Sequence, residues 1–141
     1  MKEADVGSAL AAARIRAIRI ALLNLHKALI DVERLRYGRE HGTLIESPHQ
    51  AFQLLIKDPW FAWLRPVSEL IVHGDERLAE DRPITPVEGE AYAAQTTALL
   101  KQDAAGADFR REYNRSLQEQ PDIVVAHSAV IKLAAANGVS R

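Results

Sequence analysis

The sequence contains no cysteine, and this absence excludes disulfides, thiolate catalysis and zinc or iron–sulfur sites built on cysteine. It also lacks an apolar run of the about 18–20 residues that a membrane-spanning helix requires. The apolar stretch at Ile15–Leu25 is interrupted by Arg16, Arg19 and Asn24, so it has no continuous apolar centre of the kind found in secretory signals. We therefore expect a soluble, cytoplasmic protein.

The chain also has no large excess of positive or negative charge. The chain has 18 Lys and Arg residues against 19 Asp and Glu residues, a formal net charge of −1, so no overall field directs it to nucleic acid or to an acidic membrane. Arginines at residues 14–19 and 110–115 could combine into a basic patch, but the first group alternates with apolar positions and the second includes Glu112. Neither a helix-turn-helix nor an aromatic stacking platform is evident, which argues against nucleic-acid binding.

Catalytic motifs are absent as well. There is no Gly-x-Ser-x-Gly and no glycine-rich loop before a lysine. Glu69, His73 and Glu76 share one helical face, but the pairing of glutamate and histidine that di-iron bundles use, Glu-x-x-His, occurs only at Glu46–His49, across a helix start. We predict no metal site and no cofactor.

Aromatic residues make up only 6% of the chain, and both tryptophans lie within the segment 58–66. Trp60 and Trp63 fall on the apolar stripe of a predicted helix, which indicates core packing. Phe61 and Arg65 lie off that stripe, so an exposed Phe61 beside the Arg65 guanidinium would form an edge for binding a partner. The segment is therefore either an anchor of the core or the floor of a binding site.

What the sequence does contain is typical of a helical domain. Its 141 residues make one domain, with 48% apolar and 26% charged residues. Alanine and leucine dominate, which favours helix, and we find no strand, internal repeat or low-complexity tract. We expect a single helical-bundle domain over residues 1–141, with frayed ends at 1–8 and 138–141.

The first predicted helix covers residues 9–37, a length of about 40 Å at 1.5 Å per residue. Its apolar residues alternate spacings of three and four, as in a bundle or coiled-coil seam: Ile15, Ile18, Leu22, Leu25, Leu29 and Val32. The residues that widen the seam are Ala21, Ala28 and Leu35 on one flank and Leu23 and Ile30 on the other. We expect Gly38 to end this helix. Its N-terminal end should project and pair with a second copy of the chain.

Proline marks most of the later helix starts. Each of Ser47-Pro48, Asp58-Pro59 and Thr85-Pro86 combines an N-cap with a first-turn proline, Glu88 completes a capping box, and Pro121 opens the last helix. Pro66 predicts a kink or break near residues 62–66. The faces expected to point inward are Phe52, Leu55 and Ile56; Trp60, Trp63, Leu64, Val67, Leu70, Ile71, Gly74 and Leu78; Ala91, Ala94 and Ala98; Phe109, Tyr113 and Leu117; and Ile123, Val124, His127, Val130, Ile131 and Ala134. Gly138 should stop the last helix.

These elements predict an all-α fold, a compact helical bundle of four main helices plus two short helices, with a long N-terminal helix. His26 lies at the edge of the first helix's seam, seven residues from both Arg19 and Glu33, where polar contacts between helices are usual. His127 lies near the apolar face of the last helix, so we expect a core histidine whose hydrogen bonds are satisfied.

Several of these segments together resemble a group of small, uncharacterised bacterial proteins: Leu25–Leu29, Ser47-Pro48, Asp58–Pro66 and Ser68–Ile71. The likeness spans roughly residues 20–135, and the segment DPWFAWLRP is its marker. The resemblance implies a bacterial, cytoplasmic protein that is helical throughout. It implies no activity, cofactor or catalytic residue.

Two function hypotheses follow. The first is a non-enzymatic helical bundle that acts through protein–protein contact as a homodimer, because the first helix is long and widely apolar and no catalytic set is recognisable. The alternative is a bundle that binds a small ligand or a metal, and could be an enzyme, with its site between the kinked tryptophan helix and the first helix. The residues that would form this site are Phe61, Arg65, Glu69, His73 and His26.

Overall fold

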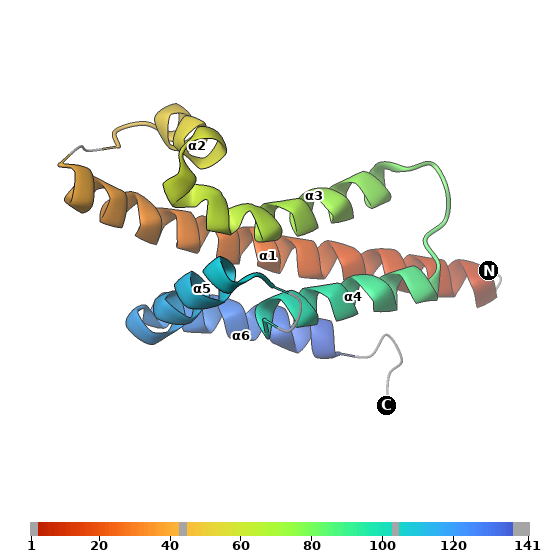
Figure 1. Cartoon of the computed structure of the whole chain (residues 1–141). Helices are drawn as coiled ribbons and strands as arrows, with labels where there is room; N and C mark the ends of the chain where they lie inside the picture. Colours follow the sequence, from red (N-terminus) through yellow and green to blue (C-terminus); the bar gives the residue numbers. More distant parts are fainter. Residues whose placement is uncertain (1–2, 43–44, 103–104, 137–141) are drawn as a thin grey trace.

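A computed structural model describes residues 3–42, 45–102 and 105–136, and every regular element within them is a helix. The elements are α1 (Glu3–His41), α2 (Pro48–Lys57), the 3-10 helix η1 (Pro59–Leu64), α3 (Arg65–Ala79), α4 (Pro86–Leu100), α5 (Ala107–Glu119) and α6 (Pro121–Ala135) (Figure 1). The all-α prediction is confirmed, with α1, α3, α4 and α6 as the main helices and α2 and α5 as the short ones. None of the described helices is both long and apolar enough to cross a bilayer.

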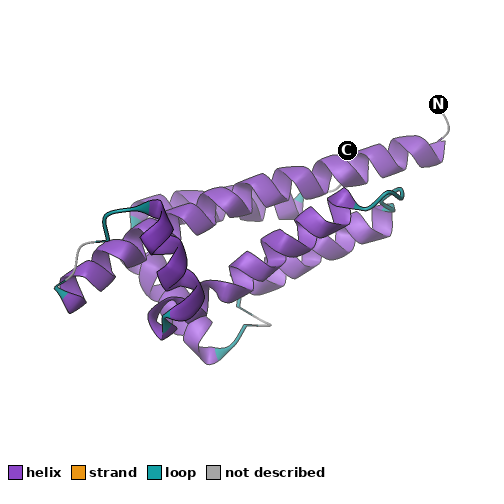
Figure 2. Cartoon of the chain, turned by 90° about the horizontal axis from the view of Figure 1, so that it is seen from above, coloured by secondary structure: helices purple, strands orange, loops and turns teal. Residues whose placement is uncertain are grey.

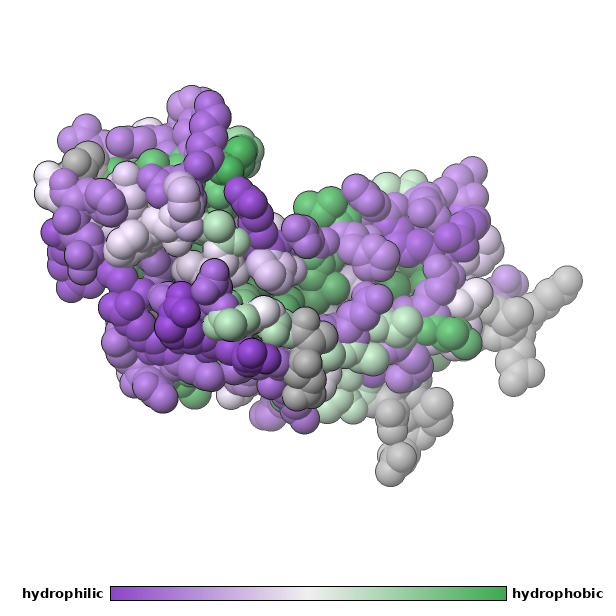
Figure 3. All heavy atoms as spheres, viewed as in Figure 1, coloured by the Kyte–Doolittle hydropathy of each residue, from purple (hydrophilic) through white to green (hydrophobic). Residues whose placement is uncertain are grey.

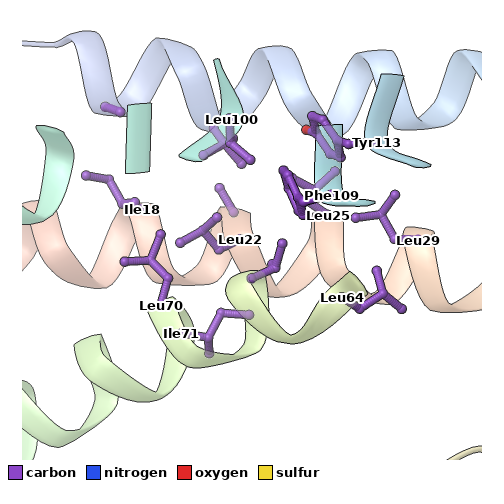
Figure 4. Close-up of a cluster of buried hydrophobic side chains, with 14 of the residues drawn as sticks. Ile18, Leu22, Leu25, Leu29, Leu64, Leu70, Ile71, Leu100, Phe109 and Tyr113 are labelled. Atoms are coloured by element: carbon purple, nitrogen blue, oxygen red, sulfur yellow. The ribbon is translucent and has the colours of Figure 1, made fainter. Parts of the chain in front are cut away.

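The other elements assemble on α1, which contacts α3, α4, α6 and η1 and runs along one edge of the molecule (Figure 2). The predicted seam forms the core. Ile18, Leu22, Leu25 and Leu29 are fully buried and point between the neighbouring helices (Figure 4). Side chains from η1, α3, α4 and α5 meet them, including Leu64, Leu70, Ile71, Leu100, Phe109 and Tyr113. The N-terminal turns of α1 extend past the ends of α3, α4 and α6 (Figure 1).

The helix α1 is longer than the sequence predicts at both ends. It begins at Glu3, continues through Gly38 and ends at His41, with Gly42 in the left-handed region at φ 63°. A glycine inside a helix costs only about 1 kcal/mol, and aromatic contacts offset this cost because Tyr37 and His41 pack on Trp60 at ring distances of 5.8 and 5.4 Å. The prediction that Leu35 widens the buried seam is wrong, since 66% of the surface of this residue is exposed.

The predicted helix starts are confirmed. Ser47 Oγ accepts from the Gln50 N–H at 3.1 Å, and Asp58 Oδ1 accepts from the Trp60 N–H at 2.9 Å. The break predicted near Pro66 is also confirmed, because the 3-10 helix ends at Leu64 and Pro66 lies in the first turn of α3. A proline there loses no helical hydrogen bond, so the change of helix type accommodates it. Gly138 lies outside the described residues, and α6 ends at Ala135.

Three predicted inward faces are wrong in part. Phe52 and Ile56 are exposed, and Ala51 is the buried residue of α2. In α4 the exposed residues include Ala91 and Ala94, while the buried ones are Gly89, Tyr92, Ala93, Thr96 and Leu100. Alanine lies on several sides of α4, so no single face is marked as apolar and the bulky residues decide its rotation. Val124 is exposed on α6, whereas Ile123, Val130 and Ala134 are buried as expected.

Gly74 allows α3 to approach α4 closely. A Cβ at this position would lie 2.6 Å from the Tyr92 hydroxyl, which donates a hydrogen bond to the Leu70 carbonyl at 2.9 Å. The Tyr92 ring therefore occupies the space that a side chain at residue 74 would need.

Arg77 joins the end of α3 to the start of α4. Its Nη2 donates to Glu88 Oε1 at 2.9 Å and to the Pro83 carbonyl at 2.8 Å, while its Nε donates to Glu88 Oε2. Glu88 Oε1 also accepts from the Thr85 backbone N–H at 3.0 Å, completing the predicted capping box. These donors, Arg77 above all, lower the pKa of Glu88 from 4.5 to about 2.

We expect the Glu88 carboxylate to make stability depend on pH. Since its folded-state pKa lies below its unfolded-state pKa, its stabilisation is present above pH 4.5 and is lost as the pH falls towards 2. Glu88→Gln should lower the midpoint of urea unfolding at neutral pH, and the deficit relative to wild type should shrink across this window. Circular dichroism at a series of pH values measures it, with the exposed Glu76→Gln as control. A deficit that stays constant with pH would contradict the role of the charge.

Candidate functional site

Phe61 is 1% exposed and belongs to the core, so it forms no exposed edge beside Arg65. The reason is the type of helix. A 3-10 helix has three residues per turn, so Phe61 lies above Leu64 and both point into the bundle, whereas an α-helical period places Phe61 off the stripe. Its ring lies 5.6 Å from that of Tyr37.

The remaining predicted site residues lie at three separate places. Arg65 is exposed and donates from Nη2 to the Ile56 carbonyl of α2 at 3.3 Å. Glu69 and His73 are exposed on α3 and line a shallow hollow that faces α4. His26 lies between α1 and α3, where its Nε2 shares a hydrogen bond with Ser68 Oγ at 2.7 Å. The structure therefore does not bring the five residues into one site.

Both half-buried histidines have hydrogen-bond partners. Burial lowers the pKa of His26 and of His127, which favours the neutral imidazole in each. His127 Nδ1 lies 2.6 Å from the Tyr113 hydroxyl, as expected for a satisfied core histidine. Within the part of the chain that the structure describes, no group of three or more histidine, aspartate or glutamate side chains could hold a metal ion.

A polar cavity does lie between α1 and the tryptophan helix, where the alternative hypothesis places a site, but other residues line it. The cavity has a volume of about 280 Å³ and is closed on its third side by α5. Its lining residues are Glu33 and Arg36 of α1, Pro59, Trp60, Ala62 and Trp63 of η1, and Asp108, Arg111, Glu112 and Arg115 of α5. This volume lies just below the about 300 Å³ at which small-molecule pockets begin.

Local sequence periods bring these residues to one place. Glu33 and Arg36 are three apart on α1, which puts them on one face. Asp58 caps the start of η1, and the three-residue period then directs Trp60 and Trp63 to the same side. On α5 the spacing of residues 108, 111, 112 and 115 follows the helical repeat and forms a charged stripe facing α1.

Arg36 is the centre of the charge network beside the cavity. It is buried, and its Nη1 donates to Glu33 Oε1 at 2.7 Å and, more weakly, to Glu112 Oε2 at 3.5 Å. Its Nη2 donates to Glu119 Oε2 at 3.3 Å. Glu33 is 1% exposed. Burial raises the pKa of Glu33, and the neighbouring Arg36 guanidinium opposes this rise.

Neither indole N–H group of the two tryptophans makes a regular hydrogen bond within the described residues. Trp60 Nε1 and Trp63 Nε1 are both buried and have no hydrogen-bond partner among the described residues. The Trp60 indole faces Glu33 and lowers the pKa of that carboxyl, although its geometry falls outside that of a regular hydrogen bond. Trp63 is held by packing, with its ring 5.9 Å from Phe109.

The proposed basic patch does not form among the described residues. Arg14 donates to Glu90 and to the Ala134 carbonyl, and Arg19 pairs with Asp75 at 2.7 Å. Two of the three arginines of α5 are likewise paired, Arg111 with Asp108 at 3.1 Å and Arg115 with Glu119 at 3.3 Å. The positive charges of α1 and α5 are therefore largely balanced by neighbouring carboxylates.

Comparison of the chain with family models, with curated proteins and with solved structures finds no match. The resemblance carried by the segment from Asp58 to Pro66 therefore stays a prediction.

Proposed function

We propose that this protein is a non-enzymatic helical bundle that acts through protein–protein contact and forms a homodimer along the outer face of α1. The observation that carries the proposal is a second apolar seam on α1, opposite to the one in the core. Its members are Val6, Leu10, Ala13, Ala17 and Ile20, which alternate spacings of four and three. Leu10 and Ile20 are 53% and 52% exposed, and such a seam is the pattern by which helices pair.

The charges beyond the seam favour a second copy in the antiparallel direction. After Ile20 the same face continues with Asn24, Lys27 and Asp31, which are polar and exposed. A parallel pair would place Lys27 against Lys27 and Asp31 against Asp31 of the second copy, and like charges in register are unfavourable. An antiparallel pair centred on Ala13 matches the apolar segment with itself only and leaves these charges in solvent.

The sizes of the side chains fit the same arrangement. With Ala13 on the two-fold axis, Val6 faces Ile20 of the second copy, and Leu10 lies level with Arg16 and one residue from the small Ala17. Alanine at the centre allows the two helices to approach closely, and the self-complementary patch is what a two-fold interface requires. Apolar residues also gather on the surface near the start of α4, beside the N-terminal end of α1 (Figure 3), so a partner there would cover more than the seam alone.

Native mass spectrometry and analytical ultracentrifugation test the proposal. The wild-type chain should be a dimer, and the double substitution Leu10→Glu with Ile20→Glu should give a folded monomer, because both positions are exposed in the bundle and buried only in the pair. Val125→Glu on α6, which changes another exposed apolar residue, should leave the dimer intact. A monomeric wild type, or a dimer in the double variant, would overturn the proposal.

A second candidate function is the binding of a small ligand, and the cavity between α1, η1 and α5 favours it. A bacterial, cytoplasmic setting is likewise proposed, and the resemblance of the tryptophan segment supports it.

A further inference from the structure

A hollow of about 310 Å³ opens between the N-terminal parts of α1 and α4, beside the seam of the proposed dimer. Leu10 and Ala11 of α1 and Pro86 and Gly89 of α4 form its apolar wall. The two helices approach closely here, since a Cβ on Gly89 would lie 3.2 Å from the Cβ of Ala11. Leu10 belongs both to this wall and to the seam, so a partner that covers the seam borders the hollow.

Helix α6 lies on the same flank of α1 but ends at the hollow. Arg14 marks the boundary, because its Nη1 donates to Glu90 of α4 and its Nη2 donates to the Ala134 carbonyl of α6 at 3.0 Å. Helix α6 ends one residue later, at Ala135, and the N-terminal turns of α1 extend past it (Figure 1). Among the described residues, only those of α1 and α4 line the hollow. Helix α6 therefore covers this flank of α1 after Arg14 and not before it.

The antiparallel pair brings the α6 of the second copy to the uncovered part of the flank. A two-fold axis at Ala13, perpendicular to both helices, keeps the flank that carries Arg14 on the same side of the pair in both copies. Residues after Ala13 in one copy then lie level with residues before Ala13 in the other. The second copy's α6 therefore comes to lie beside the hollow. Because α6 ends near the level of the axis, the two copies of this helix do not overlap.

We propose that the last two turns of α6 of a second copy occupy the hollow between α1 and α4. The proposal rests on the proposed dimer and adds a second contact to it. The exposed residues of these turns are mostly small or apolar and include Ala129, Leu133 and Ala135. Such residues match the apolar wall of the hollow.

Charge also matches across this contact. Lys132, on the same two turns of α6, is exposed and has no ion-pair partner within the part of the chain that the structure describes. Glu90 lies at the rim of the hollow, and 62% of its side chain is exposed although it pairs with Arg14. Opposite charges at the edge of an interface favour one partner and one register over others, so Lys132 of the second copy beside Glu90 fixes how the α6 helix lies.

A dimer needs contact beyond the seam. Specific interfaces bury about 1,200–2,000 Å² in total, and a seam on a single helix supplies only part of that area. The contact of α6 with the hollow occurs twice in a two-fold dimer, once on each side of the axis. It therefore enlarges the interface at both ends of the seam.

Crosslinking between chosen residues is the direct test, because the chain has no cysteine of its own. One sample carries Glu90→Cys and is ¹⁵N-labelled, and a second, unlabelled sample carries Lys132→Cys. The two are mixed, allowed to exchange subunits and treated with a short bis-maleimide. Mass spectrometry should show a covalent product of one labelled and one unlabelled chain in excess of the products of two like chains. Such a mixed product can only join residues of different copies.

Asp122→Cys is the matched control, because it is an exposed residue in the first turn of the same helix. Mixed with labelled Glu90→Cys, it should give little mixed product, since the first turn of α6 lies at the far end of the helix from the hollow. Leu133→Glu should weaken dimerisation about tenfold or more in analytical ultracentrifugation, because it places a carboxylate in the contact near Glu90. Circular dichroism should show that every variant is folded.

The results separate this contact from the dimer itself. A monomeric wild-type chain would overturn both proposals. If the wild type is a dimer that the double substitution in the seam dissociates, but residue 90 links to residue 132 no better than to residue 122, the seam is the interface and the seating of α6 is overturned. A Leu133→Glu variant that dimerises as tightly as wild type would also overturn the seating of α6.

Discussion

The substitution Leu25→Glu is expected to prevent this chain from folding. Leu25 is fully buried near the middle of α1 and lies beside Phe109 in the core (Figure 4). Truncating a buried leucine to alanine already costs about 2.7–5.0 kcal/mol, and a carboxylate without a partner in an apolar core adds the cost of desolvating a charge. Domains are stable by only about 5–15 kcal/mol, so the sum removes most or all of the folding free energy. Leu22→Glu should act in the same way.

Far-ultraviolet circular dichroism and urea unfolding measure this loss. The matched control is Leu35→Glu, which makes the same chemical change on the same helix at a residue that is 66% exposed. The control should unfold within about 0.5 kcal/mol of wild type, as surface substitutions usually do. A cooperative unfolding transition in Leu25→Glu, with helicity equal to that of the control, would show that residue 25 does not belong to the core.

The contrast between these two leucines shows what a sequence pattern can predict. The residues from Ile15 to Leu29 recur at helical spacing with bulky side chains, and every neighbouring helix contacts that stripe, so their burial follows from local periodicity. Leu35 continues one flank of the same pattern, but at this level of α1 the neighbouring elements η1 and α5 cover the side that carries Glu33 and Arg36 and leave Leu35 exposed. Periodicity says which residues share a face and does not say which side the neighbouring helices cover.

Helix α4 shows a second limit. Its start was predictable, because Thr85, Pro86 and Glu88 form a capping signal that depends only on local chemistry. The face that α4 turns inward was not predictable, because alanines occur on several sides of the helix. The Tyr92 ring, which packs over Gly74 of α3, determines the orientation of α4 about its axis. The outward seam on α1 was missed for a related reason. Ile20 falls outside the core spacing, so the sequence pattern alone does not show that it belongs to a second apolar face.

The sequence predicts where the candidate site lies but not which residues line it. A position between the first helix and the tryptophan helix was predicted, and the cavity lies there. Its residues were missed because η1 is a 3-10 helix, which turns Phe61 inward, and because the third wall comes from α5, about 75 to 80 residues after Glu33 in the chain. A sequence shows the charged stripe of α5 as an ordinary solvated face, and only the tertiary contact with Arg36 turns it into part of a site.

The substitution Arg36→Met is expected to have the second large effect. Methionine keeps an unbranched apolar chain and removes the charge, so Glu33 stays buried without the guanidinium that lies 2.7 Å from it. Removing one partner of a buried ion pair costs about 3–5 kcal/mol, and here Glu112 and Glu119 also lose a shared counter-charge. Arg111→Met, at a mostly exposed arginine of the same network, should cost less than about 1 kcal/mol.

The pH dependence of Arg36→Met separates a buried charge from a loss of packing. Burial already raises the pKa of Glu33 above 4.5, and losing Arg36 removes a group that opposes the rise. A carboxyl with a raised folded-state pKa costs stability while it is ionised, and that cost disappears as the pH falls through the folded-state value towards 4.5. The variant should therefore recover part of its stability on mild acidification, the reverse of the trend expected from Glu88.

Replacing both members of the pair completes the argument. The double variant Arg36→Met with Glu33→Leu has no buried charge at residue 33. Most of the lost stability should therefore be restored, because an apolar pair of similar size can replace a buried ion pair at little cost. The gain of stability on acidification should also disappear, since no carboxyl is left at this position to titrate. Urea unfolding at neutral and mildly acidic pH compares Arg36→Met, the double variant and the Arg111→Met control with wild type. If the double variant is as unstable as Arg36→Met at neutral pH, the loss lies in the contacts of Arg36 with α5 and not in the isolated charge of Glu33.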